Sequence, residues 1–349
     1  MKQDIHIGEL SVGPAKKMYG YMQVSRRPDG SWVTIPVVIV NGAEDGPRLW
    51  LQAGCHGEEV AGTFCVTEIV NGLDPNKLRG AVIGIPVVNT PALMASNFST
   101  VGQRLTPGDF KNLNRVFPGD PNGSLSDQIA DRLFTEIKKW ADVLIDVHDG
   151  GWALNEAPLV IFPKTGNPEF NRKQRDLARS LLLDIVWVTT ASLPGAGGAL
   201  GDACFKAAEL GIPSLMLELS GSYNYPEGYE YSVGGRVKGI LNAMRFLEMI
   251  GGKVENGKKQ KMIVDAWFRC VKHGGFLHYK VELGEIVTKG QVIAEVKDIF
   301  NREVVDTFVC PFENGLIAVR RSHPAVNPGD WVVNIGQVVE DEEKLLYRS

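Results

Sequence analysis

The sequence predicts an α/β fold: a mostly parallel or mixed sheet with helices on both faces, followed by a small all-β domain. Between residues 47 and 250, apolar runs of strand length alternate with longer helical stretches, and this alternation is typical of a sheet covered on both faces. After residue 261 the helical stretches stop and glycine turns become dense, which indicates an all-β unit. The length of 349 residues exceeds one typical core and favours two domains.

Residues 1–45 are expected to form strands that open the larger domain, which spans residues 1–250. The run MYGYMQV is followed by turn residues at 27–30 and then by WVTIPVVIV, which predicts a hairpin. Further strands are expected at LWLQAG, AVIGIPVV, VLIDV and SLMLEL, and helices at EEVAGTFCVTEIVNGL, SLSDQIADRLFTEIKKWA and RKQRDLARSLLLD.

Residues 251–261 (GGKVENGKKQK) are polar and lysine-rich, and they form the expected linker. Residues 262–349 contain strand-like runs separated by glycine turns, which predict a β-barrel or sandwich. The run VELGEIVTKGQVIAEV resembles half of a lipoyl- or biotinyl-type domain, with Lys297 as the nearest candidate for a cofactor-carrying lysine. A structural or access-limiting role for this domain is the favoured interpretation.

Composition excludes several classes of function. The formal net charge of -4 gives no general attraction to nucleic acid or to an anionic membrane. No apolar run approaches the ~20 residues that span a bilayer, and the first residues lack the apolar core of a signal peptide. The five cysteines are scattered and form no CxxC, which argues against a disulfide framework. A cytoplasmic protein is therefore expected.

Two segments carry candidate metal ligands. In GCHGEE, His56 and Glu59 lie three residues apart at an expected strand-to-helix turn, where an imidazole and a carboxylate can converge on one zinc ion. A solvated helix N-terminus would explain the same acidic residues. His148 directly follows an apolar run, at the strand end where open α/β sheets place ligands. A structural histidine is the alternative, and Asp146 is a candidate acceptor for its ring.

Two further segments carry candidate catalytic and binding groups. Glu218 lies inside the otherwise apolar run SLMLEL, where burial would raise its pKa towards the range useful for proton transfer. A buried salt bridge is the alternative. Asn114 and Arg115 are adjacent in a loop that ends in Pro-Gly, and a guanidinium group beside an amide suits capture of a carboxylate. Arg104 lies upstream in another loop; taken singly, each arginine would be a surface residue.

Together these segments resemble the succinylglutamate desuccinylase/aspartoacylase family, a branch of the zinc-carboxypeptidase-like fold. GCHGEE, NLNRVFPG, DVHDGG and IPSLMLELSG occur in this order and span most of residues 48–221. The resemblance implies that one zinc ion per chain is bound by His56, Glu59 and His148. It also implies that Glu218 is the general base and later the general acid.

The resemblance further implies that Asn114 and Arg115 hold a substrate carboxylate and that Arg104 stabilises the oxyanion. The stretch between Arg104 and Asn114 is longer than in the best-known members. Asn112 stands where many members have aspartate. Three tyrosines follow Glu218 and either line the substrate pocket or lie in an exposed turn: Tyr223, Tyr225 and Tyr229.

The expected function is zinc-dependent hydrolysis of the amide bond of a small N-acyl amino acid, of the deacetylase or desuccinylase type. The expected partner is a small molecule with a carboxylate, and N-acetyl-diaminobutyrate is one candidate. A metallocarboxypeptidase acting on peptide C-termini would use the same zinc site. A non-catalytic binding protein on the same fold is a third possibility, although such a protein needs no buried base. Exposed strand edges would permit a homo-oligomer.

Overall fold

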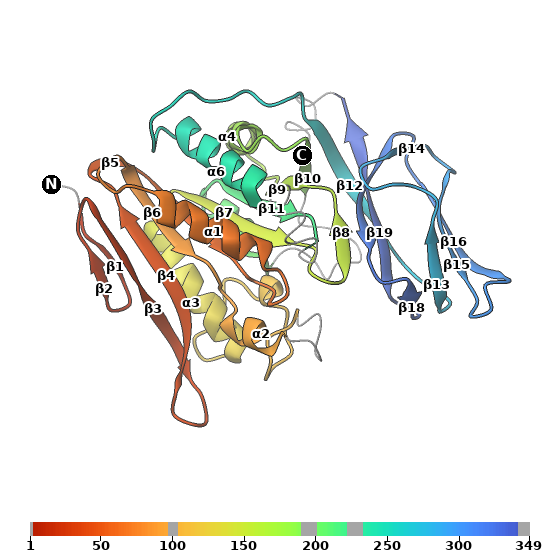
Figure 1. Ribbon diagram of the computed structural model, residues 1–349, viewed down its shortest axis with the longest axis horizontal. Coiled ribbons are helices and arrows are strands. Elements are labelled where there is room, and N and C mark those ends of the chain that lie inside the picture. The colour runs from red at the N-terminus through yellow and green to blue at the C-terminus, as the bar shows by residue number, and fades with distance from the viewer. Residues whose placement is uncertain (1–2, 97–103, 190–200, 222–232, 341–349) are drawn as a thin grey trace.

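The computed structural model describes most of the chain, namely residues 3–96, 104–189, 201–221 and 233–340. The predicted fold class is confirmed: the molecule is a mixed α/β structure with additional antiparallel strands at its C-terminal end (Figure 1). Within the described helices, no segment is both long enough and apolar enough to cross a bilayer. All five cysteines lie in described residues, and each is a free thiol.

One large mixed sheet runs through the molecule. Its strands in the N-terminal part are β3 (Lys16–Arg26), β4 (Trp32–Asn41), β5 (Glu44–Ala53), β6 (Arg79–Ile85), β7 (Val143–Asp149), β9 (Leu159–Pro163), β10 (Ile185–Thr189) and β11 (Ser214–Leu219). Its C-terminal strands are β12 (Lys261–Cys270), β14 (Ile286–Val287), β17 (Gly315–Arg321) and β19 (Trp331–Val339), and the short β8 (Leu154–Glu156) pairs with β17. The order across the sheet is β14-β17-β19-β12-β10-β9-β11-β7-β5-β6-β4-β3.

Two smaller sheets complete the strand content. At the N-terminal end β1 (Ile5–Ile7) pairs with β2 (Leu10–Val12). At the C-terminal end a four-stranded antiparallel sheet contains β16 (Val304–Val309), β15 (Val292–Lys297), β13 (Gly275–Tyr279) and β18 (Ala325–Val326). This sheet and the β-rich end of the large sheet enclose an apolar core that includes Val296, Phe308 and Ile335, as in a β-sandwich.

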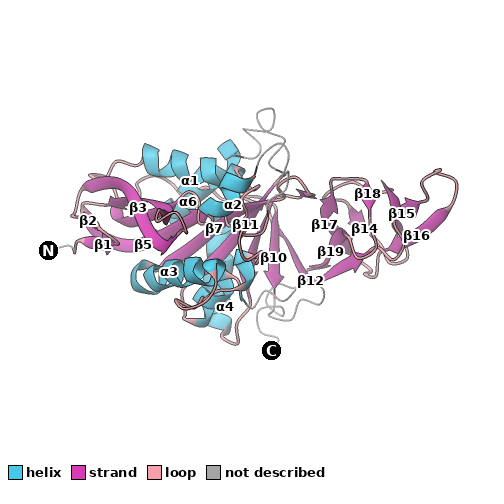
Figure 2. Ribbon diagram, turned by 90° about the horizontal axis from the view of Figure 1, so that it is seen from below, coloured by secondary structure: helices cyan, strands magenta, loops and turns pink. Residues whose placement is uncertain are grey.

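The helices cover both faces of the N-terminal part of the large sheet, and Figure 2 shows α1 and α3 on opposite sides of it. The core on one side contains residues of α1 (Ala61–Gly72), α4 (Pro168–Ser180) and α6 (Gly235–Phe246). The core on the other side contains residues of α3 (Leu125–Trp140) and α5 (Ala203–Glu209). Two short elements lie between β6 and α3: α2 (Thr90–Ala95) and the 3-10 helix η1 (Leu113–Arg115).

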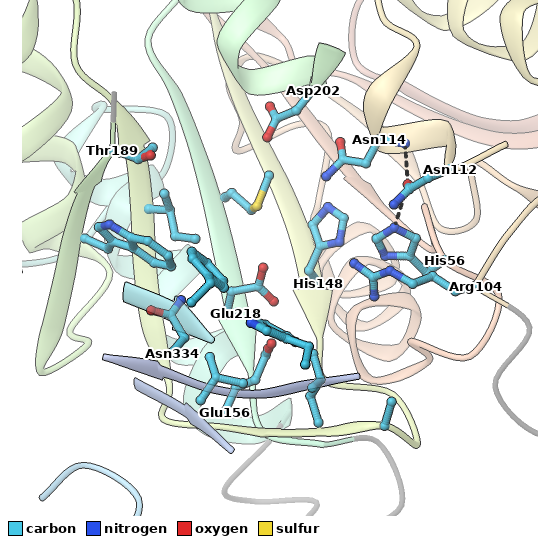
Figure 3. A pocket seen from close by; sticks show the side chains of 18 of the residues that line it. His56, Arg104, Asn112, Asn114, His148, Glu156, Thr189, Asp202, Glu218 and Asn334 are labelled. Carbon is cyan, nitrogen blue, oxygen red and sulfur yellow. Dashed lines mark hydrogen bonds between the residues drawn. The ribbon is translucent and has the colours of Figure 1, made fainter. Parts of the chain in front are cut away.

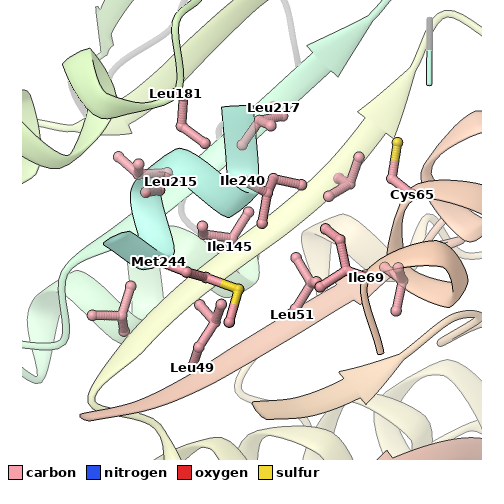
Figure 4. Packing of buried hydrophobic residues seen from close by; sticks show 14 of the residues in the cluster. Leu49, Leu51, Cys65, Ile69, Ile145, Leu181, Leu215, Leu217, Ile240 and Met244 are labelled. Atoms are coloured by element: carbon pink, nitrogen blue, oxygen red, sulfur yellow. The ribbon is translucent and has the colours of Figure 1, made fainter. Parts of the chain in front are cut away.

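Strand alternation explains how one strand serves both cores. Successive side chains of a strand point to opposite faces of the sheet. Leu49 and Leu51 of β5 therefore pack in the α1 and α6 core (Figure 4), whereas Trp50 packs in the α3 core. Because both faces are covered, the central strands read as continuous apolar runs in the sequence.

The large sheet continues across the expected linker. Residues 251–260 contain no helix or strand and lead directly into β12. This strand pairs in parallel with β10, with Ile185 opposite Lys261. The sequence did not predict this continuity, because it carries no local signal for pairing between strands that lie 76 residues apart.

Candidate active site

The predicted metal ligands meet at the carboxyl ends of two neighbouring parallel strands. β5 and β7 pair in parallel, with Ala53 opposite Val147, so the turn after β5 and the end of β7 lie close together. His56, Glu59 and His148 are almost fully buried, and one potential ligand atom from each lies within 4.8 Å of the others. The three residues form the only such group of candidate metal ligands in the described part of the chain.

Both imidazole rings direct Nδ1 towards Glu59. His56 Nδ1 lies 2.6 Å from Oε1 of Glu59, and His148 Nδ1 lies 2.9 Å from Oε2. The Nε2 atoms face oxygen atoms instead: Oδ1 of Asn112 at 3.0 Å from His56 and Oδ2 of Asp146 at 3.3 Å from His148. At His56 the oxygen acceptor holds the proton on Nε2 and leaves the Nδ1 lone pair for a metal. At His148 the Asp146 carboxylate lies close enough to Nε2 for an ion pair. The donor set fits a zinc ion.

Burial and charge act differently on the two histidines. Burial, with Arg104 nearby, lowers the pKa of His56 to about 4. Burial also acts to lower the pKa of His148, but the carboxylates of Asp146 and Glu59 outweigh it and raise that pKa. A metal ion binds neutral imidazole, so a bound metal would favour the neutral form of both rings.

Arg104 lies at the edge of this cluster. Its guanidinium donates a hydrogen bond from Nη1 to Oε1 of Glu59 at 2.9 Å, and the side chain is 39% exposed. Arg104 also lines the cavity described below. The predicted arginine therefore lies beside the metal-ligand cluster, where it could contact a substrate oxygen.

Glu218 lies beside the cluster on β11. In the parallel pair of β11 and β7, Glu218 is directly opposite His148. Its carboxyl group shares a hydrogen bond with that of Glu156. Burial raises the pKa of Glu218, while His148 and the hydrogen bond with Glu156 act in the opposite direction. Burial and the neighbouring Glu218 raise the pKa of Glu156 well above its usual range.

His56, Arg104, His148, Glu156 and Glu218 line one cavity of about 560 Å³. Figure 3 shows Glu218 and His148 between Asn114 and Asp202 on one side and Glu156 and Asn334 on the other. The predicted carboxylate clamp also lines the cavity, since Asn114 and Arg115 of η1 are among its wall residues. The β-rich part of the chain supplies another wall, which includes Phe268, Trp331 and Asn334.

The segment that carries the clamp is fixed to the cluster. The side chain of Asn112 accepts a hydrogen bond from the Asn114 N–H at 2.9 Å and contacts His56 through the same oxygen. The Arg115 guanidinium donates to the Asn114 carbonyl at 2.8 Å. Asn112 therefore links the candidate substrate clamp to one candidate metal ligand.

Comparisons with known proteins agree with this geometry. A family model described as succinylglutamate desuccinylase/aspartoacylase catalytic domain matches residues 45–229. The N-alpha-acetyl-L-2,4-diaminobutyric acid deacetylase of Halomonas elongata is 30% identical over 333 residues, which cover 92% of this chain and 92% of that protein. The chain belongs to the succinylglutamate desuccinylase/aspartoacylase family.

Solved structures related to the family share the fold over nearly the whole chain. A succinylglutamate desuccinylase/aspartoacylase from Rhodobacter sphaeroides aligns with a TM-score of 0.80 at 23% identity, covering 93% of this chain and 96% of that one. A product-bound ectoine utilization protein from Ruegeria pomeroyi aligns with a TM-score of 0.80 at 22% identity, covering 93% and 97%. The likeness therefore includes the C-terminal β-rich part.

The structure brings all seven predicted residues of this family member to one site, but sequence reasoning missed several others. Glu58 and Glu156 are buried carboxyl groups that line the cavity. Burial and Glu59 raise the pKa of Glu58 to about 7. Glu156 directly precedes the apolar run at residues 157–163, a signal related to that of Glu218. Phe268 and Asn334 carried no comparable signal in the sequence.

The predicted Tyr223, Tyr225 and Tyr229 lie outside the described residues.

Proposed function

We propose that this protein hydrolyses the amide bond of a small N-acyl amino acid, using a zinc ion held by His56, Glu59 and His148. One observation carries the proposal: the three candidate ligands converge in a cavity that also contains Glu218 and Arg115. Candidate metal ligands, a buried carboxyl group and a guanidinium group in one cavity are the groups that amide hydrolysis of a carboxylate-bearing substrate requires.

The proposed mechanism divides the work between the metal and the side chains. A bound zinc ion supplies a Lewis acid for the acyl carbonyl and lowers the pKa of water to near neutrality. Glu218 takes a proton from the attacking water and then delivers it to the leaving amine. Its place opposite His148 and its raised pKa support both roles, because proton transfer is most effective when the pKa lies near the working pH.

Two arginines have separate proposed roles. Arg104, beside Glu59, stabilises the negative charge that develops on the acyl oxygen; one such donor contributes roughly 3 kcal/mol in other hydrolases. Arg115 and Asn114 bind the carboxylate of the amino acid. The Oδ1 atom of Asn114 is buried without a hydrogen-bond partner in the described residues, and a substrate N–H group could satisfy it.

The similarity to the Halomonas protein suggests which type of substrate to assay first. That protein is a deacetylase of an N-acetylated diamino acid. We therefore propose N-acetyl amino acids, including N-acetyl diamino acids, as the first substrates to assay. The wall formed by Phe268 and Trp331 closes the cavity on one side and favours small molecules over long peptides.

Metal content tests the proposed ligands. We expect about one zinc ion per chain in the wild-type protein, measured by elemental analysis after dialysis. His148→Ala should lose both the zinc and the deacetylase activity, because it removes one of three ligands. His273→Ala, an exposed histidine of the β-rich part, is the matched control and should keep both. Wild-type protein that fails to bind zinc would contradict the proposal.

Arg115→Ala tests the clamp separately from the metal. The substitution removes a charged contact to the substrate, so we expect kcat/KM for N-acetyl amino acids to fall by about 10- to 100-fold. The zinc content should stay at the wild-type level. Loss of zinc in this variant would show that Arg115 supports the cluster and does not bind the substrate.

A further inference from the structure

A row of four side chains from both parts of the chain forms one wall of the cavity. Glu156 of β8 lies opposite Val319 of β17, and Val319 lies opposite Asn334 of β19. Asn334 in turn lies opposite Phe268 of β12. All four residues line the cavity, and the mechanism proposed above assigns none of them a catalytic step.

Two oxygen atoms in this row are buried without a donor. Within the described residues, no N–H or O–H group donates to Oε2 of Glu156 or to Oδ1 of Asn334. Glu156 is 6% exposed and Asn334 is 1% exposed. Leaving a polar atom buried in this way is unfavourable unless a ligand supplies the missing hydrogen bond. Both atoms are acceptors, so the wall is complementary to a ligand that donates hydrogen bonds.

Aromatic rings stand beside these oxygens. The rings of Phe268 and Trp331 stack with their centroids 5.1 Å apart, and the Trp187 ring lies 6.1 Å from Phe268. All three line the same cavity. A carboxyl group, an amide oxygen and aromatic rings together favour a cationic amine, through charge-assisted hydrogen bonds and cation–π attraction.

This wall is within reach of a small substrate bound at the cluster. Glu218 is opposite His148, and the Glu156 carboxyl group hydrogen bonds to that of Glu218. In Figure 3, Glu156 and Asn334 lie on the far side of Glu218 from Asn114. An amino acid with its acyl group at the cluster and its carboxylate near Asn114 can therefore direct its side chain towards Glu156.

We propose that Glu156 and Asn334 are specificity-determining residues that bind a second, free amino group in the side chain of an N-acyl diamino acid. This inference rests on the proposed deacylase function and adds the groups that select the side chain. The ammonium group favours the ionised form of the Glu156 carboxyl group and pairs with it, and Asn334 accepts a hydrogen bond from the same ammonium group. The substrate is then held at both ends, with its carboxylate at Arg115 and its amine at Glu156.

A side-chain carboxylate is the competing ligand. The indole N–H groups of Trp187 and Trp331 are also buried without an acceptor in the described residues, and they could donate to an oxygen. However, a carboxylate at this wall would meet the carboxyl groups of Glu156 and Glu218, and like charges at contact are unfavourable. The amine is therefore the better match, and the test separates the two ligands.

The test compares three N-acetyl amino acids that differ only in the side-chain end group. N-acetyl-2,4-diaminobutyrate carries an ammonium, N-acetylnorvaline a methyl group in the same place, and N-acetylglutamate a carboxylate. We expect the wild-type kcat/KM to favour the ammonium over the methyl substrate by about 20-fold or more, as for a hydrogen bond to a charged group. Glu156→Gln and Asn334→Leu should each lower this ratio.

Asn155→Ala is the matched control on the same strand. Leu154 and Glu156 line the cavity, so Asn155 between them points to the other face of β8, and the ratio should stay unchanged. A wild-type preference for the methyl or carboxylate substrate would overturn the proposal. So would an equal loss on all three substrates in Glu156→Gln, because Glu156 would then act only through Glu218.

Binding of the free products separates this proposal from the proposed function. We expect calorimetric titration to show that 2,4-diaminobutyrate binds the wild-type protein more tightly than norvaline, and that Glu156→Gln removes the difference. If no N-acetyl amino acid is hydrolysed but this difference is present, the deacylase function fails and the amine subsite stands. If the two products bind equally, the subsite is wrong whatever the activity.

Discussion

At the scale of single residues, the site depends on oxygen atoms that orient the two histidines. Asn112 faces His56 at 3.0 Å, and Asp146 faces His148 at 3.3 Å. Asp146 is itself held by Gln52, whose side-chain amide donates to it at 2.9 Å. These partners are buried or belong to the clamp segment, so the ring orientations are fixed before any ligand binds. Such partners commonly contribute a factor of 10–100 to metal affinity.

Asp202 gives a prediction about pH. Burial raises the pKa of this carboxyl group to about 6 from its ordinary 3.8, against the effect of the Phe205 N–H that it caps. Between these values the native state binds more protons than the unfolded state, so stability falls as pH rises from about 4 to 6. Asparagine can cap the helix in the same way without this titration.

We therefore expect the free energy of unfolding of Asp202→Asn to increase relative to wild type as pH rises through this window, by up to about 3 kcal/mol. Urea unfolding at pH 4, 5, 6 and 7 measures the difference. A difference that is independent of pH would show that Asp202 is ionised in the native state throughout this range.

At the scale of elements, tight turns position the site between strands and helices. The segment of η1 lies against Gly201, which precedes the N-cap residue of α5. The Phe117 N–H, two residues after η1, donates to the Gly201 carbonyl at 2.9 Å. A Cβ atom at position 201 would collide with the Arg115 carbonyl. Glycine is required here because the two backbones approach closely.

Gly201→Ala should therefore displace the clamp while leaving the cluster intact. We expect KM for an N-acetyl amino acid to rise by about 10-fold or more, since small misplacements of a positioning group are costly, with zinc content unchanged. Gly166→Ala is the control: it also precedes a helix cap, but its Cβ would meet nothing within 4 Å. Equal KM values for the two variants would contradict this account.

At the scale of the whole molecule, the two parts of the chain share a sheet and a core. One apolar cluster combines Leu159 and Trp187 of the N-terminal part with Ile263, Leu316 and Val319 of the C-terminal part. The Ala157 N–H also donates to the Ala318 carbonyl at 2.8 Å. The β-rich part thus completes the cavity wall and covers the β10 edge of the sheet.

This shared core predicts a single cooperative unfolding transition for the full chain. Leu316→Ala should lower the free energy of unfolding by about 2–5 kcal/mol and shift that transition as a whole. Ile299→Ala, at a position that is 74% exposed, should change it by no more than about 0.5 kcal/mol. Urea unfolding followed by circular dichroism and tryptophan fluorescence measures both. Separate transitions by the two probes would show that the parts unfold independently.

The sequence by itself determined the fold class and indicated the three cluster residues and Glu218. Alternating apolar runs and helical stretches are local patterns, and they predict a covered sheet without knowledge of its order. His56, Glu59 and His148 could be predicted to converge because residues at the ends of parallel strands share one edge of a sheet. Glu218 was recognisable because a carboxylate inside an apolar strand is costly unless it has a partner or a function.

Only the tertiary structure decided what surrounds that cluster. The continuation of the sheet from β10 to β12 and the register of β8 with β17 bring Phe268 and Asn334 beside Glu156. These residues lie far apart in the chain, and the pairing of distant strands depends on the packing of whole elements rather than on any local pattern. The side-chain selectivity of the site therefore arises from a wall that no segment of the sequence encodes alone.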